Sequence, residues 1–395
     1  MKLVRQSVEY GEVFDAPRLL LNVHALPRLA APAEGDPPLT PVYDSLTTNV
    51  PHPTMGFLSL PFPHETPIYP PAEAVHKYLQ HYAEHFGLLE HIKLNSSVSS
   101  VTRDKDAGKW VVTTRNAVTE DDIVSYDFVI VANGHYHVPR VPTTPGLQTW
   151  LDAGRAQHSI YYRNPSSIGT AQTLLVRRAV LHRPHLIGSI TNGKPSNSEN
   201  PNLKIRGRVA HCDTPASNRV VFEDGTALSG IDHVVLGTGY EAALPFLAPD
   251  VLHVAIPPRA RARTSRGARE LDSIVPMPCY EAQAIFVAHV FAHPAALDLA
   301  AETDAVTARY DLLRARFSRP PSSPLPSPAD AFSGAPPGPA LDLAVAKAWD
   351  VFEGHAQFAY RDALRGVAGD PVRVEDWERE ATDARLTLRD TWKSL

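Results

Sequence analysis

Two stretches of this sequence share one pattern and decide the fold: YDFVIVANGHYHVPRV (Tyr126–Val141) and IDHVVLGTGYEAALPFL (Ile231–Leu247). In each, an acidic residue precedes a short β-branched apolar run, which ends at a glycine-containing turn. The apolar runs, Phe128–Ala132 and His233–Leu236, are too short and too β-branched for helices. They predict buried strands of a sheet that is covered on both faces.

The turns after these runs, Asn133-Gly134 and Gly237-Thr238-Gly239, suggest a ligand site. Glycine lets bare backbone approach a bound molecule, and open α/β sheets hold ligands at the carboxyl ends of their strands. For either turn alone, an ordinary strand-to-loop glycine explains the sequence equally well. Because the same arrangement, an apolar run that ends at a glycine-containing turn, occurs twice, a dinucleotide-type site is favoured.

The composition describes an ordinary globular protein. The chain has 395 residues, 43% hydrophobic and 21% charged, which is enough for two domains or one large interrupted domain. A net charge of −5 gives no support to nucleic-acid binding. The two cysteines, Cys212 and Cys279, lie far apart, so we expect neither a disulfide framework nor a metal site. The N-terminal residues have no apolar signal core and no apolar run reaches membrane length, so we expect a cytoplasmic protein without a transmembrane segment.

The remaining chain predicts several further elements. The pattern of Pro71–Gly87 predicts an amphipathic helix. Apolar and polar residues alternate along Ile92–Val101 and Lys109–Thr114, which predicts two strands of a hairpin. The other expected elements are a strand at Thr173–Val176, two strands within Val209–Asp224, a helix or strand at Ala282–Ala292, and helices within Leu341–Leu364 and Val374–Trp392.

The segment Tyr43-Asp-Ser-Leu-Thr-Thr-Asn49-Val-Pro51, with Met55 and Pro61-Phe62-Pro63 behind it, resembles the flavin-facing segment of flavin-containing monooxygenases, particularly fungal-type members. The resemblance continues through Ala132-Asn133-Gly134-His135-Tyr136, His158-Ser159 and Thr238-Gly239-Tyr240. It covers residues 41–165 well and residues 205–295 moderately. The ordered combination is specific, although each piece alone is weak.

The resemblance implies an α/β fold of the FAD/NAD(P)-binding, two-dinucleotide type, with three layers, truncated at the N-terminus and in the nucleotide domain. It implies an FAD-type domain at residues 1–165, a reduced NADPH-type domain at 166–230 and a return to the FAD-type domain at 231–317. A Pro/Ser-rich linker at 318–340 and a C-terminal helical segment at 341–395 complete this division.

The resemblance also implies the site residues. Asn49 would be the catalytic residue, near the reactive edge of the isoalloxazine, where its amide can both donate and accept. The alternative is an asparagine that caps a turn before proline. His158 is expected to be a core histidine that fixes a strand turn. The expected cofactor-binding residues are Thr48, Asn49, Met55, Ala132, Asn133, Gly134, Thr238, Gly239 and Tyr240.

Both dinucleotide fingerprints of that family are missing here. The sequence contains no G-x-G-x-x-G, and its only G-x-G is Gly237–Gly239. In mid-chain, Leu174–Val176 runs into Arg177-Arg178-Ala179 where the second fingerprint is expected, and His185–Thr191 resembles the strand that should follow the nucleotide helix. We therefore expect the flavin-ring side of the site to be kept and both phosphate cradles to be absent.

The implied function is flavin-dependent monooxygenation with FAD and NADPH. One atom of dioxygen would pass to a nitrogen, sulfur or carbonyl centre of a small molecule such as a secondary metabolite. One alternative is a catalytically inactive, family-derived protein that binds a small molecule or a partner, and another is an incomplete gene product. The C-terminal helices could dock on the core or support a homodimer.

Overall fold

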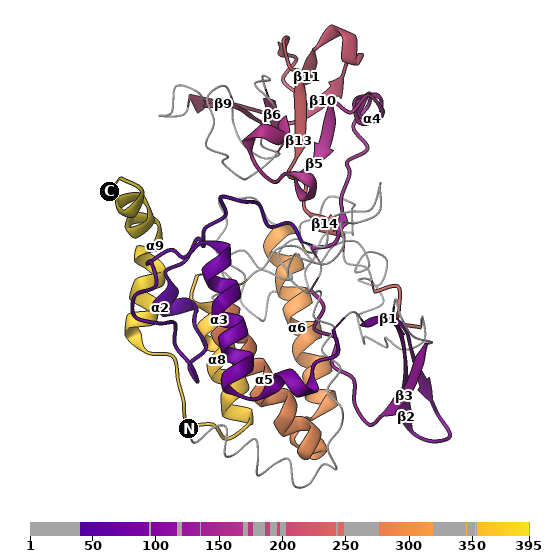
Figure 1. Cartoon of the computed structure of the whole chain (residues 1–395), viewed down its shortest axis with the longest axis vertical. Coiled ribbons are helices and arrows are strands. Elements are labelled where there is room, and N and C mark those ends of the chain that lie inside the picture. The colour runs from indigo at the N-terminus through magenta and orange to yellow at the C-terminus, as the bar shows by residue number, and fades with distance from the viewer. Residues whose placement is uncertain are drawn as a thin grey trace. The chain divides into compact units, whose positions relative to one another are not determined.

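A computed structural model divides the chain into two compact units, each with its own hydrophobic core (Figure 1). Unit 1 comprises residues 1–25, 47–133 and 244–395, and unit 2 comprises residues 26–46 and 134–243. The structure describes residues 40–94, 96–116, 121–134, 136–168, 173–176, 186–189, 196–197, 203–241, 244–248, 276–318, 345, 352 and 354–394.

Unit 1 combines helices with a three-stranded antiparallel sheet. The helices are α2 (His52–Met55), α3 (Ala72–His85), α5 (Pro276–Ala292), α6 (Leu299–Ser318), α8 (Ala356–Val367) and α9 (Asp376–Ser394), with 3₁₀ turns at Leu88–His91 and Pro294–Ala296. The strands, in sheet order, are β1 (Ser96–Asp104), β2 (Lys109–Asn116) and β3 (Asp122–Tyr126). No helix in the described part of the chain is long and apolar enough to cross a membrane.

The amphipathic helix predicted at Pro71–Gly87 is confirmed as α3. Gly87 follows it in the left-handed conformation, with φ of 64°, which is the usual way for glycine to end a helix. Tyr78, from the predicted apolar stripe, is buried with Met55 and Met277 in the core of unit 1. The helix therefore forms because one of its faces is covered.

The predicted hairpin is also confirmed, as β1 and β2. The prediction of a strand at Phe128–Ala132 is wrong, because this run forms no strand. Val129 is half-buried against the core of the three-stranded sheet, but Phe128, Ile130 and Val131 are 41%, 56% and 42% exposed. The ladder between β3 and β2 reaches Tyr126↔Trp110, and β2 begins only one residue before Trp110, so β2 offers no further residues for pairing. An apolar β-branched run favours a strand but does not supply its partner.

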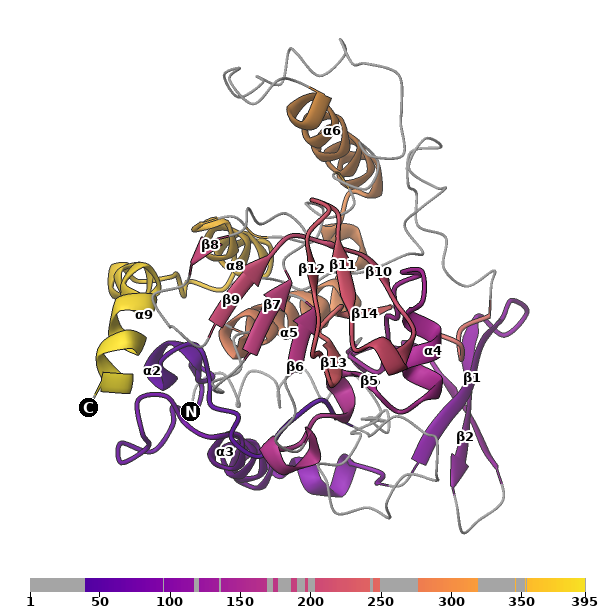
Figure 2. The ribbon, with the colours of Figure 1, turned by 90° about the horizontal axis from the view of Figure 1, so that it is seen from above.

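Unit 2 is built on a six-stranded, mostly parallel sheet with the order β5-β13-β6-β7-β9-β8 (Figure 2). Neighbouring strands run parallel except β8 and β9. The strands predicted at Thr173–Val176 and His233–Leu236 are confirmed as β6 and β13. The other strands are β5 (Ala156–His158), β7 (Leu186–Ser189), β8 (Ser196–Asn197) and β9 (Leu203–Arg206).

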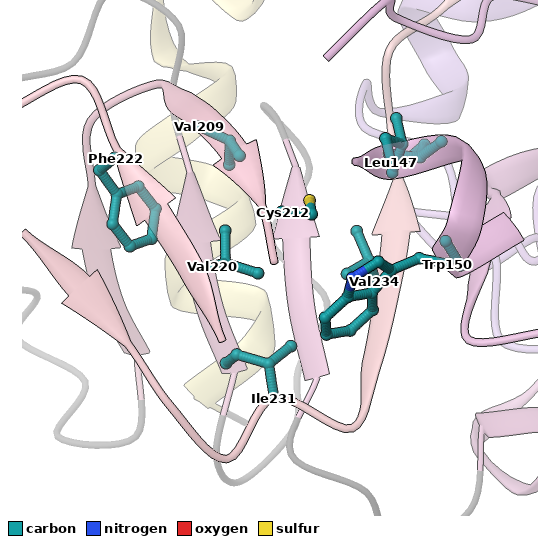
Figure 3. Packing of buried hydrophobic residues seen from close by; sticks show 10 residues of the cluster. Leu147, Trp150, Val209, Cys212, Val220, Phe222, Ile231 and Val234 are labelled. Atoms are coloured by element: carbon teal, nitrogen blue, oxygen red, sulfur yellow. The ribbon is translucent and has the colours of Figure 1, made fainter. Parts of the chain in front are cut away.

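A second sheet of unit 2 packs with helix α4 (Leu147–Asp152) around the main core (Figure 3). Its antiparallel strands are β10 (Val209–Cys212), β11 (Val220–Phe222) and β12 (Ala227–Leu228), which confirms the two strands predicted within Val209–Asp224. Trp150, Val220 and Ile231 have no exposed surface in this core.

The C-terminal part of the chain contains the predicted helices. Ala282–Ala292 lies within α5 and is a helix, and Val374–Trp392 corresponds to α9. Within Leu341–Leu364, the described residues form α8 from Ala356 onward. The linker predicted at 318–340 lies almost entirely outside the described residues, and the five-part domain division stays a prediction.

Candidate functional site

The two glycine-containing stretches meet in unit 2, beyond the carboxyl end of β13. The first glycine turn leads to β4 (Val138–Pro139) and the second leads to β14 (Tyr240–Glu241), and these short strands pair antiparallel. The rings of Tyr136 and Tyr240 lie 5.2 Å apart, measured between their centroids. The pattern that the sequence repeats is therefore brought together at the predicted edge of the sheet.

Both glycine turns present bare backbone to open space. Gly134 and Gly239 have φ angles of 69° and 76°, and no heavy atom lies within 4 Å of the position that a Cβ would take at either residue. The second turn is held by the first stretch, because the Thr238 hydroxyl donates to the carbonyl of Arg140. The Arg140 N–H in turn donates to the carbonyl of Gly239 at 2.9 Å.

His158 supports the second turn from inside the unit. It is 2% exposed, its Nδ1 accepts the N–H of Ile160 at 3.2 Å, and its Nε2 lies 3.0 Å from the carbonyl oxygen of Gly239. Because Nδ1 accepts, the neutral ring carries its proton on Nε2 and donates it to Gly239. Burial lowers the pKa of His158, which favours this neutral form. The predicted structural role of His158 is confirmed.

In unit 1, the loop around Asn49 is fixed on both sides while its amide is exposed. The Thr48 N–H donates to the carbonyl of Pro70 at 3.0 Å, and the Thr48 hydroxyl donates to the carbonyl of Val50 at 2.8 Å. The Asn49 side chain makes no hydrogen bond within the described residues, so the turn-capping alternative has no support there. Its catalytic role stays a prediction.

The other predicted cofactor-binding residues of unit 1 differ in exposure. Met55 is only 4% exposed and belongs to the core, where it packs with Phe62 and Tyr78. Ala132 is exposed and Asn133 is half-buried, at the end of the segment that does not form the expected strand. Contact of these residues with a cofactor stays a prediction.

The turn after α2, Phe57–Leu60, is held by a tyrosine. The hydroxyl of Tyr78 accepts the N–H of Phe57 at 2.8 Å and donates to the carbonyl of Leu60 at 2.6 Å. A phenol that both accepts and donates must be neutral. Burial raises the pKa of Tyr78 to about 12, so the neutral form holds this turn throughout the physiological range.

Glu281 of α5 holds the same turn, and the sequence did not predict this. Its carboxylate oxygens accept the N–H groups of Leu58 and Ser59 at 3.1 Å each, and Arg365 of α8 donates to it at 3.1 Å. Arg365, with a 2% exposed side chain, also pairs with Asp370 at 2.5 Å. The available signal was the single carboxylate in a mostly apolar helix, because a buried charge needs a partner.

The described residues do not fit NADPH at the place that the resemblance implies. β6 and β7 are adjacent and parallel, from Thr173↔Leu186 to Val176↔Ser189, and residues 177–185, nine in all and without glycine, connect them. A parallel crossover with a helix usually takes a dozen or more residues. The G-x-G turn after β13 leads into strand β14 and so offers no helix N-terminus for a pyrophosphate.

The described residues do fit the ring end of a flavin. In unit 2, the open backbone at the two glycine turns can face a ring with hydrogen-bonding edges. In unit 1, the exposed Asn49 amide, which has no hydrogen-bond partner among the described residues, is a separate group of that kind. Within the described residues, no glycine-rich turn that opens a helix is available for the pyrophosphate end of the cofactor.

Comparison with known sequences agrees with these features. Residues 31–178 match the family described as FMO-like, flavin-binding monooxygenase-like. The thiol-specific monooxygenase of Saccharomyces cerevisiae is 29% identical over 226 residues, which are 53% of this chain and 51% of that protein. Flavin-containing monooxygenase FMO GS-OX5 of Arabidopsis thaliana is 29% identical over 231 residues, 52% of this chain and 48% of that protein. The chain thus spans about half the length of the curated relatives it matches.

Comparison with solved structures concerns the fold. S-allyl-L-cysteine S-oxygenase from Allium sativum matches with a TM-score of 0.66 and 24% identity, over 89% of this chain and 79% of that one. Tmm from Pelagibacter sp. strain HTCC7211 matches with a TM-score of 0.69 and 15% identity, over 96% and 86%. The predicted α/β fold of the FAD/NAD(P)-binding type is confirmed, and residues 31–178 of this chain are similar to the flavin-binding monooxygenase-like family.

Proposed function

We propose that this protein is a flavin-dependent monooxygenase that transfers one atom of dioxygen to a small molecule. The observation that carries the proposal is the free amide of Asn49, presented on a loop fixed on both sides, inside the segment that matches the family. A bound flavin would supply the oxygen chemistry, so the protein needs only to bind, orient and exclude water. No separate acid–base pair or nucleophile is required.

The predicted site residues take roles within their own units. In unit 1, Asn49 would bind the reactive edge of the flavin ring, with Thr48 fixing its loop and Met55, Ala132 and Asn133 as further cofactor-binding residues. In unit 2, the cofactor-binding residues would be the open backbone of Gly134 and the turn formed by Thr238, Gly239 and Tyr240. FAD is the cofactor that the family relationship favours, and a cytoplasmic location fits this chemistry.

Sulfur is the first substrate atom to test, because one relative carries the name thiol-specific monooxygenase. Nitrogen comes second, because dimethylaniline monooxygenase [N-oxide-forming] 4 of Rattus norvegicus is 35% identical over 143 residues. A carbonyl centre is third.

A second candidate function is a binding protein without catalysis, in which the C-terminal helices could support a homodimer. The nine-residue connection between β6 and β7 favours it, because that connection differs from what a nicotinamide dinucleotide site requires.

The test uses the full chain, chemically reduced FAD, labelled dioxygen and a small thioether, with catalase present to remove free peroxide. We expect a sulfoxide that contains one labelled oxygen atom. The Asn49→Ala variant should lower product formation about 10²-fold while flavin binding is retained, because a donor aimed at developing charge contributes about that much. Ser45→Ala, an exposed polar position of the same motif, is the matched control and should be unchanged. Flavin binding without any labelled product would favour the binding protein instead.

A further inference from the structure

The mid-chain sheet of unit 2 bears on which reductant can supply the electrons that the proposed oxygenation consumes. Oxygenation of a substrate S consumes two electrons, since one oxygen atom enters the product and the other becomes water: S + O₂ + FADH₂ → SO + FAD + H₂O. The reduced flavin must therefore be regenerated. The nicotinamide site that the resemblance implies for this step lies at β6 and β7.

The connection between β6 and β7 is too short to combine a phosphate-binding turn with a helix. The paired strands are four residues long, so the chain must return about 10 Å along them to begin β7. A G-x-G-x-x-G turn alone takes six residues. Residues 177–185 contain no glycine, so the sequence between the two strands supplies none of the residues that such a turn requires.

The other glycine turn does not replace the missing one. The carbonyl of Gly239 is bonded by the N–H of Arg140 and by His158 Nε2, and the chain then continues as strand β14. The Gly237–Gly239 turn is thus a structural link between two strands. The sheet itself is continuous, because β6 pairs with β13 on one side and with β7 on the other. These described strands of unit 2 thus form one sheet, and none of its described glycine turns opens a helix of the sheet's crossovers.

We propose that this protein does not bind NADPH and instead receives flavin that is already reduced by a separate NAD(P)H-dependent flavin reductase. The inference rests on the proposed monooxygenase function and adds the class of reaction that must precede it. The exposed Asn49 amide of unit 1 is a group that a diffusing flavin could use, because its contact with a flavin ring does not depend on the pyrophosphate.

The test compares three probes on the full chain without oxygen: NADPH, followed by its own fluorescence, and photoreduced FAD and FMN, followed by absorbance. We expect at least one reduced flavin to bind at least about tenfold more tightly than NADPH, a difference of about 1.4 kcal/mol. We also expect NADPH to bleach added oxidised flavin at the same rate with and without the protein. Supplying a flavin reductase should then allow labelled sulfoxide to form in air.

Two results would overturn the inference in different ways. Saturable NADPH binding that accelerates flavin bleaching would contradict it while leaving the monooxygenase function standing. If neither flavin binds in either redox state, both the monooxygenase function and the need for a reductase are contradicted.

Discussion

Gly146 shows how a single backbone position can determine whether unit 2 folds. Its φ is 78°, and a Cβ added there would lie 1.9 Å from the carbonyl oxygen of Cys212. We predict that Gly146→Ala lowers the free energy of unfolding by at least about 3 kcal/mol, because backbone strain is joined by a clash with main chain. Gly154→Ala is the matched control, since φ is 67° there but nothing lies within 4 Å. It should lose only about 1–2 kcal/mol in denaturant unfolding, and equal losses would contradict the clash.

His158 should make the stability of unit 2 depend on pH. Its pKa is lowered in the folded protein, so below the unfolded value of about 6.5 the unfolded chain takes up the proton more readily. The free energy of unfolding should therefore fall as pH decreases, by at most about 1.4 kcal/mol per pH unit for this group. In His158→Gln, which keeps a donor for Gly239, this contribution should disappear. The lowered pKa values of His52 and His233 affect both proteins and cancel in the difference. Parallel pH profiles would contradict the prediction.

At the scale of elements, the buried ion pair between Glu281 and Arg365 joins α5 and α8, and Asp370, just after α8, shares the same arginine. Arg365 donates to both Glu281 and Asp370, so Arg365→Met would leave two buried carboxylates without their cation. We predict a loss of about 3–5 kcal/mol in the free energy of unfolding. Lys77→Met, which breaks an ion pair whose side chains are 71% and 74% exposed, should leave the free energy of unfolding nearly unchanged. Denaturant unfolding measures both, and similar losses would contradict the contrast.

Elements with a complete local signal could be predicted from the sequence. Helix α3 carries its apolar stripe and its terminal glycine within one stretch, and β13 is an apolar run that ends at a glycine turn. Phe128–Ala132 has the same local signal as β13, yet its structure depends on a partner strand, which the run itself does not specify. Glu281 and Arg365 could not be paired in advance because 84 residues separate them.

In the candidate site, too, the features set by a short stretch of sequence could be predicted, and those set by contacts between distant residues could not. His158 was predicted correctly as a structural histidine, and the glycine turns have the open backbone that their sequence suggests. The fixing of the Asn49 loop could not be predicted in full, because the Thr48 N–H bonds to Pro70, which lies outside the Tyr43–Pro51 segment.

At the scale of the whole molecule, we propose that the chain keeps groups for a flavin ring and that the described strands of its mid-chain sheet offer no cradle for NADPH. Flavin binding must be tested first, because a separate reductase can supply reduced flavin to this protein only if the protein binds flavin. Absorbance titration of the full chain with FAD tests it most directly. We predict a saturable shift of the visible flavin bands. Asn49→Ala should still bind flavin but show a smaller shift at saturation, and Ser45→Ala should behave like the unchanged protein. Flavin bands identical to those of free FAD at every protein concentration would contradict the account.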